Sequence, residues 1–222
     1  MRKQRNTKGR IIAAAWRLFY EHGYDNTTID EILLESNTSR GTFYHYFKGK
    51  DALLGTLSTL FDDKYEELVD TMPAGMHAFD KLMYLNRELF RMIEDRVSLD
   101  LLARLISTQL VTKGEKHLLD HNRMYYRLLR SIISEGQRKG ELCTEASVND
   151  IVKTYALCER ALMYDWCLCS GEYSLANYAQ KMMPAFMGMY RADIYQKFNN
   201  QNRIRFESCI EFILLKISRN YS

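Results

Sequence analysis

Residues 39–50 read Ser-Arg-Gly-Thr-Phe-Tyr-His-Tyr-Phe-Lys-Gly-Lys, and no other stretch of this 222-residue chain is as informative about its fold. Ser39 can cap a short helix that we expect to run to about His45. Gly41 removes a side chain from this helix at a cost of ~1 kcal/mol, which makes sense if another molecule approaches the backbone closely. The other hydrogen-bonding residues on the exposed arc are Arg40, Thr42, Tyr44 and His45, whereas Phe43 and Phe47 can point inward.

Two further helices are predicted before this stretch. Apolar residues between 11 and 19 recur with the spacing of an amphipathic helix that ends near Gly23. Residues 28–31, Thr-Ile-Asp-Glu, form a capping box that opens a second, short helix ending near Glu35. Asn37 tolerates the left-handed conformation that a tight interhelical turn requires. Helix, turn and short helix at this spacing are typical of a helix-turn-helix DNA-binding unit, although short helical hairpins also occur as plain structure.

Basic charge is concentrated at the N-terminus. Residues 1–50 hold 9 Lys and Arg against 5 Asp and Glu, whereas residues 51–222 hold 22 against 23. Five basic residues without an intervening acid begin the chain, namely Arg2, Lys3, Arg5, Lys8 and Arg10. Such a segment is typical of a phosphate-contacting arm, and a solvated tail is an equally ordinary interpretation. The polar content of residues 39–50 favours nucleic acid, because a buried helix would not carry so many polar groups.

The N-terminal region resembles the TetR family of bacterial transcriptional regulators. The resemblance covers residues 8–54 and depends on Ile11-Ile-Ala-Ala-Ala-Trp-Arg-Leu-Phe19, Gly23-Tyr24, Thr27-Thr28-Ile29, Glu31-Ile32, Ser39 to Phe47, and Lys48-Gly-Lys-Asp-Ala-Leu-Leu54. Two features depart from the family pattern. Leu33, Leu34 and Glu35 replace small residues at the end of the second helix, and Asn37 replaces the usual turn glycine.

The resemblance implies an all-α fold with two domains. A three-helix helix-turn-helix DNA-binding domain is expected over residues 1–50, and a larger helical ligand-binding and dimerisation domain over residues 51–222. The implied protein is a homodimer that binds a pseudo-palindromic double-stranded DNA operator. A small-molecule inducer would then change the spacing of the two DNA-binding units. This makes a ligand-responsive repressor the leading interpretation, with a DNA-silent helical co-regulator acting through protein contacts as the alternative.

Phosphate contacts are the first roles that the resemblance implies. Thr28 would contact a phosphate through its hydroxyl and the helix N-terminus. Tyr44 and Lys50 resemble the family's other phosphate-binding positions. Loss of Tyr44 and Lys50 would indicate the DNA-silent alternative, and both residues are present.

Base recognition is the second implied role. Arg40, Thr42 and His45 resemble base-facing positions, and Gly41 would let the helix lie deep in the groove. Arg40 is the strongest candidate because a guanidinium can bond O6 and N7 of guanine together, and a phosphate contact without sequence information is its alternative. The complete predicted DNA-binding set is Thr28, Ser39, Arg40, Gly41, Thr42, Tyr44, His45 and Lys50.

The remainder of the chain is predicted to be helical, with no competing strand pattern. Apolar residues from Leu53 to Leu68 continue a helical stripe toward Pro73. Further helices are predicted near 77–94, 98–111, 116–139, 147–170 and 174–191. Residues 192–222 contain an additional amphipathic helix, expected to pack on the domain or its partner and not on a membrane.

The last two long segments are the predicted dimer bundle, and a monomeric core is the alternative. The apolar residues of these segments are Leu157, Ala161, Leu162, Trp166, Tyr178, Met182, Phe186, Met187 and Tyr190. Large, soft side chains could also line an apolar ligand pocket, although they would equally fill a core. They include Tyr84, Phe90, Met92, Tyr125, Tyr126, Tyr155 and Met163. The ligand-binding residues themselves stay unassigned.

Four charged residues lie within otherwise apolar helical segments. Glu88, Arg104, Glu159 and Arg160 could orient a ligand or pair with one another, but such residues more often face solvent. His117 and His121 have the i, i+4 spacing of metal ligands, but no third ligand is near in sequence, so surface histidines are predicted and no metal site.

Several functional classes are not predicted. The five cysteines form an odd set without metal-ligand spacing, which fits reduced thiols in the cytoplasm. Gly-x-Ser-x-Gly, His-Glu-x-x-His and Cys-x-x-Cys motifs and glycine-rich phosphate loops do not occur, so no enzyme, catalytic residue or cofactor is predicted. The apolar runs are far shorter than the ~18 residues that cross a bilayer, and no signal peptide is recognisable. A cytoplasmic protein without membrane contact is expected.

Overall fold

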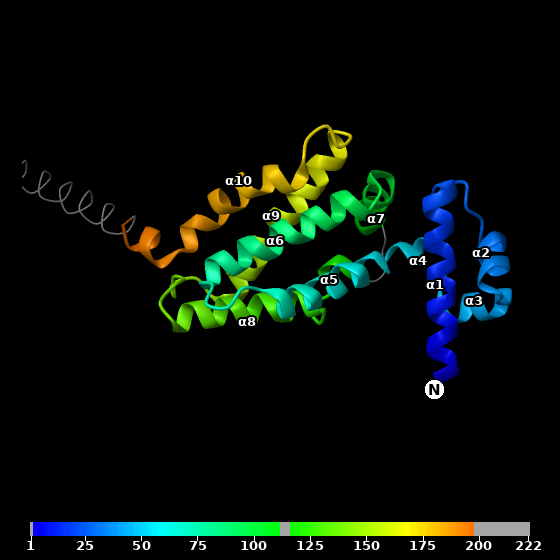
Figure 1. Ribbon diagram of the computed structural model, residues 1–222, viewed down its shortest axis with the longest axis horizontal. Helices are drawn as coiled ribbons and strands as arrows, with labels where there is room; N and C mark the ends of the chain where they lie inside the picture. The colour runs from blue at the N-terminus through cyan, green and yellow to red at the C-terminus, as the bar shows by residue number, and fades with distance from the viewer. Residues whose placement is uncertain (1, 112–115, 198–222) are drawn as a thin grey trace, which may run out of the picture.

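The computed structural model describes residues 2–111 and 116–197, and the regular elements in these ranges are helices. The predicted all-α fold is confirmed. A single isolated bridge between Leu142 and Arg191 is the strand-like feature of the described part. Figure 1 shows α1, α2 and α3 gathered at one end, with α1 nearly perpendicular to the long helices of a larger bundle.

The N-terminal unit contains α1 (Arg2–His22), α2 (Ile29–Ser36) and α3 (Arg40–Tyr46). The second and third helices end within one residue of their predicted ends. The basic residues of the predicted arm are the first turns of α1, which begins at Arg2, and their contact with phosphate stays a prediction. Within that segment, the Lys8 ammonium lies 5.9 Å from the centroid of the Phe47 ring.

Local hydrogen bonds define the turns of this unit. Thr28 Oγ1 accepts from the Glu31 amide at 3.2 Å, and Glu31 Oε2 accepts from the Thr28 amide at 2.7 Å, which completes the predicted capping box. Asn37 adopts φ +48°, the predicted left-handed turn. Phe43 and Phe47 are buried as predicted, and each contributes about 1.5–3 kcal/mol by its removal from water.

The segment between the two parts contains two helices where one continuous stripe was predicted. These are α4 (Asp51–Leu54) and α5 (Leu57–Thr71). The ring of His117 packs against Gly55 so closely that a Cβ there would clash with it. The interruption therefore reflects a tertiary contact as well as the local chain.

The larger bundle contains α6 (Ala78–Arg96), α7 (Leu99–Val111), α8 (Met124–Arg138), α9 (Val148–Leu168) and α10 (Leu175–Met187). Helix α6 packs against α5, α8 and α10, and α9 packs against α7, α8 and α10. The crossing of α6 and α8 is tight, because a Cβ at Gly136 would lie 2.5 Å from the Ala78 Cβ. This arrangement buries a continuous apolar core.

Two of the predicted helices have different extents in the structure. The single helix predicted over 116–139 is wrong, because the 3-10 turn η1 (His117–Leu119) precedes a helix that starts only at Met124. His117 and His121 consequently do not share a helix, and the i, i+4 argument no longer applies to them. Helix α10 ends at Met187 and is followed by the 3-10 turn η2 (Gly188–Tyr190).

The predicted C-terminal helix over 192–222 lies mostly outside the described residues. Residues 192–197 are helical, and residues 198–222, which include Cys209, lie outside. Cys143, Cys158, Cys167 and Cys169 are free thiols. Among the described helices, none combines the length and the apolar character needed to span a bilayer.

Candidate nucleic-acid interface and ligand cavity

The predicted DNA-binding residues lie at the N-terminus of α2, on α3 and directly after it. Thr28, Ser39, Arg40, Gly41, Tyr44 and His45 are exposed, whereas Thr42 and Lys50 are half-buried. A Cβ added to Gly41 would meet no atom within 4 Å, so the backbone at this point faces open space. The first turn of α3 is therefore accessible to another molecule.

Arg40, the first residue of α3, forms an ion pair with Asp30 of α2. The two side chains are 58% and 73% exposed, so the pair contributes about 0–1 kcal/mol. A guanidinium held so weakly can exchange Asp30 for a DNA base or phosphate. The Asp30 carboxylate also directs the guanidinium across the gap between α2 and α3.

Hydroxyl groups of this face already have partners within the chain. Ser39 Oγ accepts from the Thr42 amide at 3.2 Å and lies 2.8 Å from Thr42 Oγ1. The Thr28 hydroxyl donates to Glu31 Oε2 at 2.8 Å. Hydrogen bonds from the Thr28 backbone and side chain lower the pKa of Glu31, which keeps this acceptor ionised. Contacts from these hydroxyls to DNA would replace or share the bonds within the chain.

Tyr44 and His45 have more freedom. The Tyr44 ring meets the buried Phe43 edge-on at 5.4 Å, and its side chain is otherwise exposed. The His45 ring contacts Tyr46 at 4.8 Å in the same manner. Both residues thus present polar groups on the exposed side of α3.

Lys50 lies in a different environment from the one predicted. Its Nζ donates to the carbonyl oxygens of Tyr24 at 2.7 Å and Thr27 at 2.8 Å. The same ammonium lies 4.3 Å from the centroid of the Tyr24 ring. Lys50 therefore holds the α1–α2 loop in this structure. A phosphate contact through Lys50 stays a prediction, and it requires these hydrogen bonds to break.

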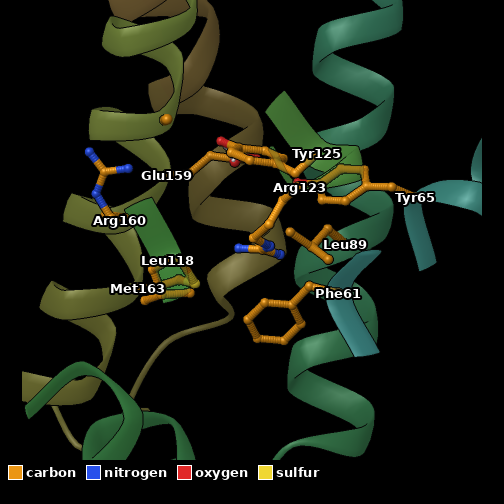
Figure 2. A pocket seen from close by; sticks show the side chains of 10 residues that line it. Phe61, Tyr65, Leu89, Leu118, Arg123, Tyr125, Glu159, Arg160 and Met163 are labelled. Atoms are coloured by element: carbon orange, nitrogen blue, oxygen red, sulfur yellow. Dashed lines mark hydrogen bonds between the residues drawn. The ribbon is translucent and has the colours of Figure 1, made fainter. Parts of the chain in front are cut away.

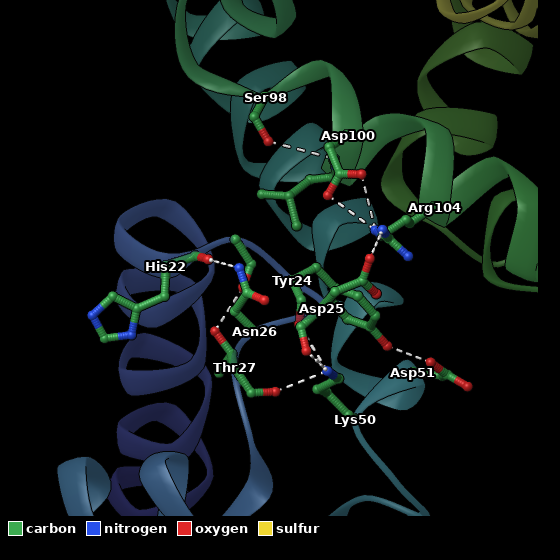
Figure 3. A network of polar contacts seen from close by, with 12 residues as sticks. His22, Tyr24, Asp25, Asn26, Thr27, Lys50, Asp51, Ser98, Asp100 and Arg104 are labelled. Atoms are coloured by element: carbon green, nitrogen blue, oxygen red, sulfur yellow. Dashed lines mark hydrogen bonds and ion pairs between the residues drawn. The ribbon is translucent and has the colours of Figure 1, made fainter.

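A polar network joins this loop to the larger bundle (Figure 3). Arg104 on α7 binds Asp100 with Nε, at 2.9 and 3.0 Å, and pairs with Asp25 of the α1–α2 loop through Nη2. Its guanidinium also lies 5.1 Å from the centroid of the Tyr24 ring. The hydroxyl of Tyr24 donates to Asp51, which begins α4. Burial and the adjacent Asp51 carboxylate raise the pKa of Tyr24.

The sequence left three roles open for Arg104: orienting a ligand, forming an ion pair or facing solvent. The structure shows an ion pair between the larger bundle and the N-terminal unit. Its partner Asp25 lies 79 residues earlier. No local pattern connects two residues so far apart, and sequence reasoning missed the contact.

A small cavity lies among α5, α6, α8 and α9, with η1 at its side (Figure 2). Its volume is about 30 Å³, enough for one or two water molecules, each of which needs about 10–15 Å³ of such space. The cavity is lined by Phe61, Tyr65, Leu89, Leu118, Arg123, Tyr125, Ala156, Glu159, Arg160 and Met163. Two residues of the predicted lining set, Tyr125 and Met163, are among them. Tyr84 lies on a separate groove of about 300 Å³ between α6 and α10.

Glu159 is the buried acid of the cavity, with only 2% of its surface exposed. Its carboxyl accepts from Asn86 Nδ2 at 2.9 Å and from the Tyr125 hydroxyl at 2.6 Å. Desolvation raises the pKa of Glu159, and these hydrogen bonds oppose the rise. The prediction that Glu159 more often faces solvent is wrong.

The other charges predicted within apolar segments have ordinary surroundings. Glu88 pairs with Arg87 at 2.7 Å and with Arg91 at 3.2 Å. Arg160 is half-buried and donates to the Tyr126 hydroxyl at 3.4 Å. Across residues 2–111 and 116–197, no three His, Cys, Asp or Glu side chains gather in a way that could hold a metal ion.

Comparison with known proteins identifies the N-terminal unit. Residues 11–57 match the family model for bacterial regulatory proteins of the tetR family. The chain is 27% identical over 204 residues to the probable HTH-type transcriptional regulator YttP of Bacillus subtilis. This match covers 85% of this chain and 90% of that protein. It is 25% identical over 146 residues to the fatty acid metabolism regulator protein of the same organism, across 64% of this chain and 74% of that protein.

The larger bundle also has counterparts among solved structures. Thermus thermophilus FadR, a TetR-family transcriptional repressor solved in complex with lauroyl-CoA, superposes with a TM-score of 0.69 at 24% identity. The match covers 81% of this chain and 92% of that one. The likeness extends the shared fold beyond the N-terminal unit to the bundle that contains the cavity.

Proposed function

The chain carries the DNA-binding domain of the tetR family of bacterial regulatory proteins, and on this basis we propose that it is a ligand-responsive transcriptional repressor. Residues 1–50 would bind DNA, and residues 51–222 would bind the ligand and a second copy of the chain. The observation that carries the proposal is the accessible first turn of α3. There Arg40 is held only by an exposed ion pair, and Gly41 faces open space.

A dimer through α9 and α10 is part of the proposal. Leu157 is 57% exposed, and Ala161, Tyr164 and Leu168 continue an exposed stripe on the same face of α9. Tyr178 and Phe186 are exposed on the neighbouring α10. Leu162, Trp166 and Met187 cannot take part as predicted, because they are buried within their own chain. A two-fold axis at these helices would pair two DNA-binding domains with the two halves of a palindrome.

The structure offers a route between cavity and DNA. Phe61 and Tyr65 of the cavity wall belong to α5, which follows α4, and Asp51 at the start of α4 holds Tyr24. A ligand that separates α5 from α9 would thus bear on the α1–α2 loop. It would release DNA only if it bound the DNA-incompetent form more tightly, by about 1–3 kcal/mol for typical coupling.

Fluorescence anisotropy across a salt titration tests the proposal, with the full chain, its own upstream DNA and a random duplex. We expect selective binding with two protomers per site. Arg40→Ala should remove about 1–3 kcal/mol of discrimination at one base pair, whereas Tyr44→Phe should weaken binding to both DNAs alike. Glu88→Gln, outside α3, is the control. Equal losses on both DNAs for Arg40→Ala would contradict base recognition, and no binding at any salt would favour the DNA-silent co-regulator.

A further inference from the structure

The Tyr65 hydroxyl is buried near the Glu159 carboxyl, whose charge helps to raise its pKa, but it makes no hydrogen bond of ordinary geometry among the described residues. The side chain is about 1% exposed and lines the cavity from α5. An unsatisfied buried hydroxyl costs about 1–3 kcal/mol, so its retention calls for an explanation. Phenylalanine would fill the same space without this cost.

The carboxyl of Glu159 lies in the same part of the cavity. Figure 2 shows Tyr65, Tyr125 and Glu159 converging from three different helices. The rings of Tyr65 and Tyr125 lie 5.1 Å apart, and Figure 2 shows Phe61 farther along the cavity wall, beyond Leu89 and the Arg123 guanidinium. A carboxyl group among aromatic rings is the environment that stabilises an organic cation, because the carboxylate and the ring faces are both negative.

Neither arginine that lines the cavity forms a direct ion pair with this carboxyl, and the charge of Arg160 acts on it only from a distance, lowering its pKa. Arg123 is engaged by Asp62, with N–O distances of 2.9 and 3.0 Å, and also donates to the Ser58 carbonyl at 2.8 Å. Arg160 follows Glu159 in sequence, but Figure 2 shows its guanidinium directed away from the carboxyl. Among the cavity residues, Glu159 is therefore the acid without an ion-pair partner.

We infer that the ligand of the proposed regulator is an arylalkylamine, a protonated aliphatic amine on an aromatic body, whose ammonium group binds Glu159 and the Tyr65 hydroxyl. The inference rests on the proposed ligand-responsive function and names the chemical class that its cavity selects. The ammonium would donate to the Glu159 carboxylate and to Tyr65 Oη, and it would lie beside the rings of Tyr65 and Tyr125. No covalent step is involved.

The present volume accommodates only the head of such a ligand. A volume of about 30 Å³ is far below the roughly 150 Å³ of a cavity that binds benzene, so the aromatic body needs the walls to move. Met163 and Leu118 form part of these walls, and methionine adapts its shape readily. Binding would therefore push α5 and α9 apart, which is the movement required to reach the α1–α2 loop.

Isothermal titration calorimetry tests the inference by measuring the affinity of the full chain for three matched probes. The probes are phenethylamine, phenethyl alcohol and phenylacetate, which share one aromatic body and differ in charge. We expect the amine to bind at least about tenfold more tightly than the other two. Lauroyl-CoA serves as a separate probe for an acyl thioester ligand.

Two variants locate the site. Tyr65→Phe should weaken amine binding about three- to tenfold while the melting temperature stays equal or rises, since the lost hydroxyl has no partner in the free protein. Glu159→Gln keeps the shape and removes the charge, and it should weaken the amine about a hundredfold without affecting the alcohol. Tyr84→Phe, on the separate groove between α6 and α10, is the matched control and should change neither quantity.

The outcomes separate the inference from the proposed function. Preference for phenylacetate, unchanged amine binding in both variants, or no binding of the amine would each overturn the inference. Tight lauroyl-CoA binding that is insensitive to Glu159→Gln would overturn it in favour of an acyl ligand. Operator binding is measured independently on the same preparations. Amine binding without DNA binding would refute the proposed repressor and not the ligand class.

Discussion

Replacing Gly41 by alanine separates what α3 contributes to folding from what it contributes to DNA binding. The new Cβ would meet no atom within 4 Å, so the folded protein accommodates it without strain. Alanine is favoured over glycine within a helix by about 0.5–1 kcal/mol. We therefore expect Gly41→Ala to raise the melting temperature by about 1–4 °C in a chain of this size.

DNA binding should change in the opposite direction. If the backbone at Gly41 approaches a base edge or phosphate, the added methyl group fills space that the DNA needs. Overpacking at an interface of this kind is expected to cost about 1–3 kcal/mol, equivalent to about a five- to 150-fold rise in Kd. The variant would thus be more stable and less active.

Far-UV circular dichroism melting and anisotropy with operator DNA check the two effects on one preparation. Ser107→Ala is the control, because Ser107 lies exposed within α7, outside the DNA-binding unit, and alanine is the better helix former. It should be slightly stabilised but keep its operator affinity. An operator Kd within twofold of the original for Gly41→Ala would refute the idea that this edge of α3 meets DNA.

Three further predictions follow from the larger bundle. Gly136→Ala should destabilise the protein by about 1–3 kcal/mol in urea denaturation, because its Cβ would lie 2.5 Å from the Ala78 Cβ; an unchanged midpoint would contradict the tight crossing. Burial raises the pKa of Glu159 in the native state, so above about pH 4.3 the native protein still holds a proton that the unfolded chain has lost. The free energy of unfolding should therefore fall as the pH rises above this value. Glu159→Gln should abolish this fall. Urea midpoints across pH test this, and equal slopes in both proteins would contradict it. Arg104→Ala should speed amide hydrogen exchange in residues 24–27 while lowering stability by at most about 1 kcal/mol, and unchanged exchange would show that the pair with Asp25 does not hold the loop.

The elements of the N-terminal unit were predictable because their signals are local. The capping box joins Thr28 to Glu31, and Ser39 caps the helix that carries Thr42. Each interaction spans three residues, which is within the range that sequence patterns encode. Exposure of Arg40 and burial of Phe43 follow from the same short helical periodicity.

Features that depend on distant residues were missed. The interruption at Gly55 involves His117, and the engagement of Lys50 involves a loop more than twenty residues earlier. The burial of Glu159 did have a signal in the sequence. Tyr155, Glu159 and Leu162 are spaced i, i+4 and i+7, so Glu159 lies on the apolar face of α9. Charge alone was a misleading guide to its exposure.

The contact between Arg104 and Asp25 changes how ionic strength acts on this protein. Salt weakens DNA binding by competing for phosphates, and the slope of log affinity against log salt is normally converted to a number of phosphate contacts. Here added ions also screen the partly exposed pair that fixes the α1–α2 loop to α7. The slope then contains a conformational contribution that involves no phosphate. Counting contacts from the slope would overstate the DNA footprint, and the excess should disappear in Arg104→Ala.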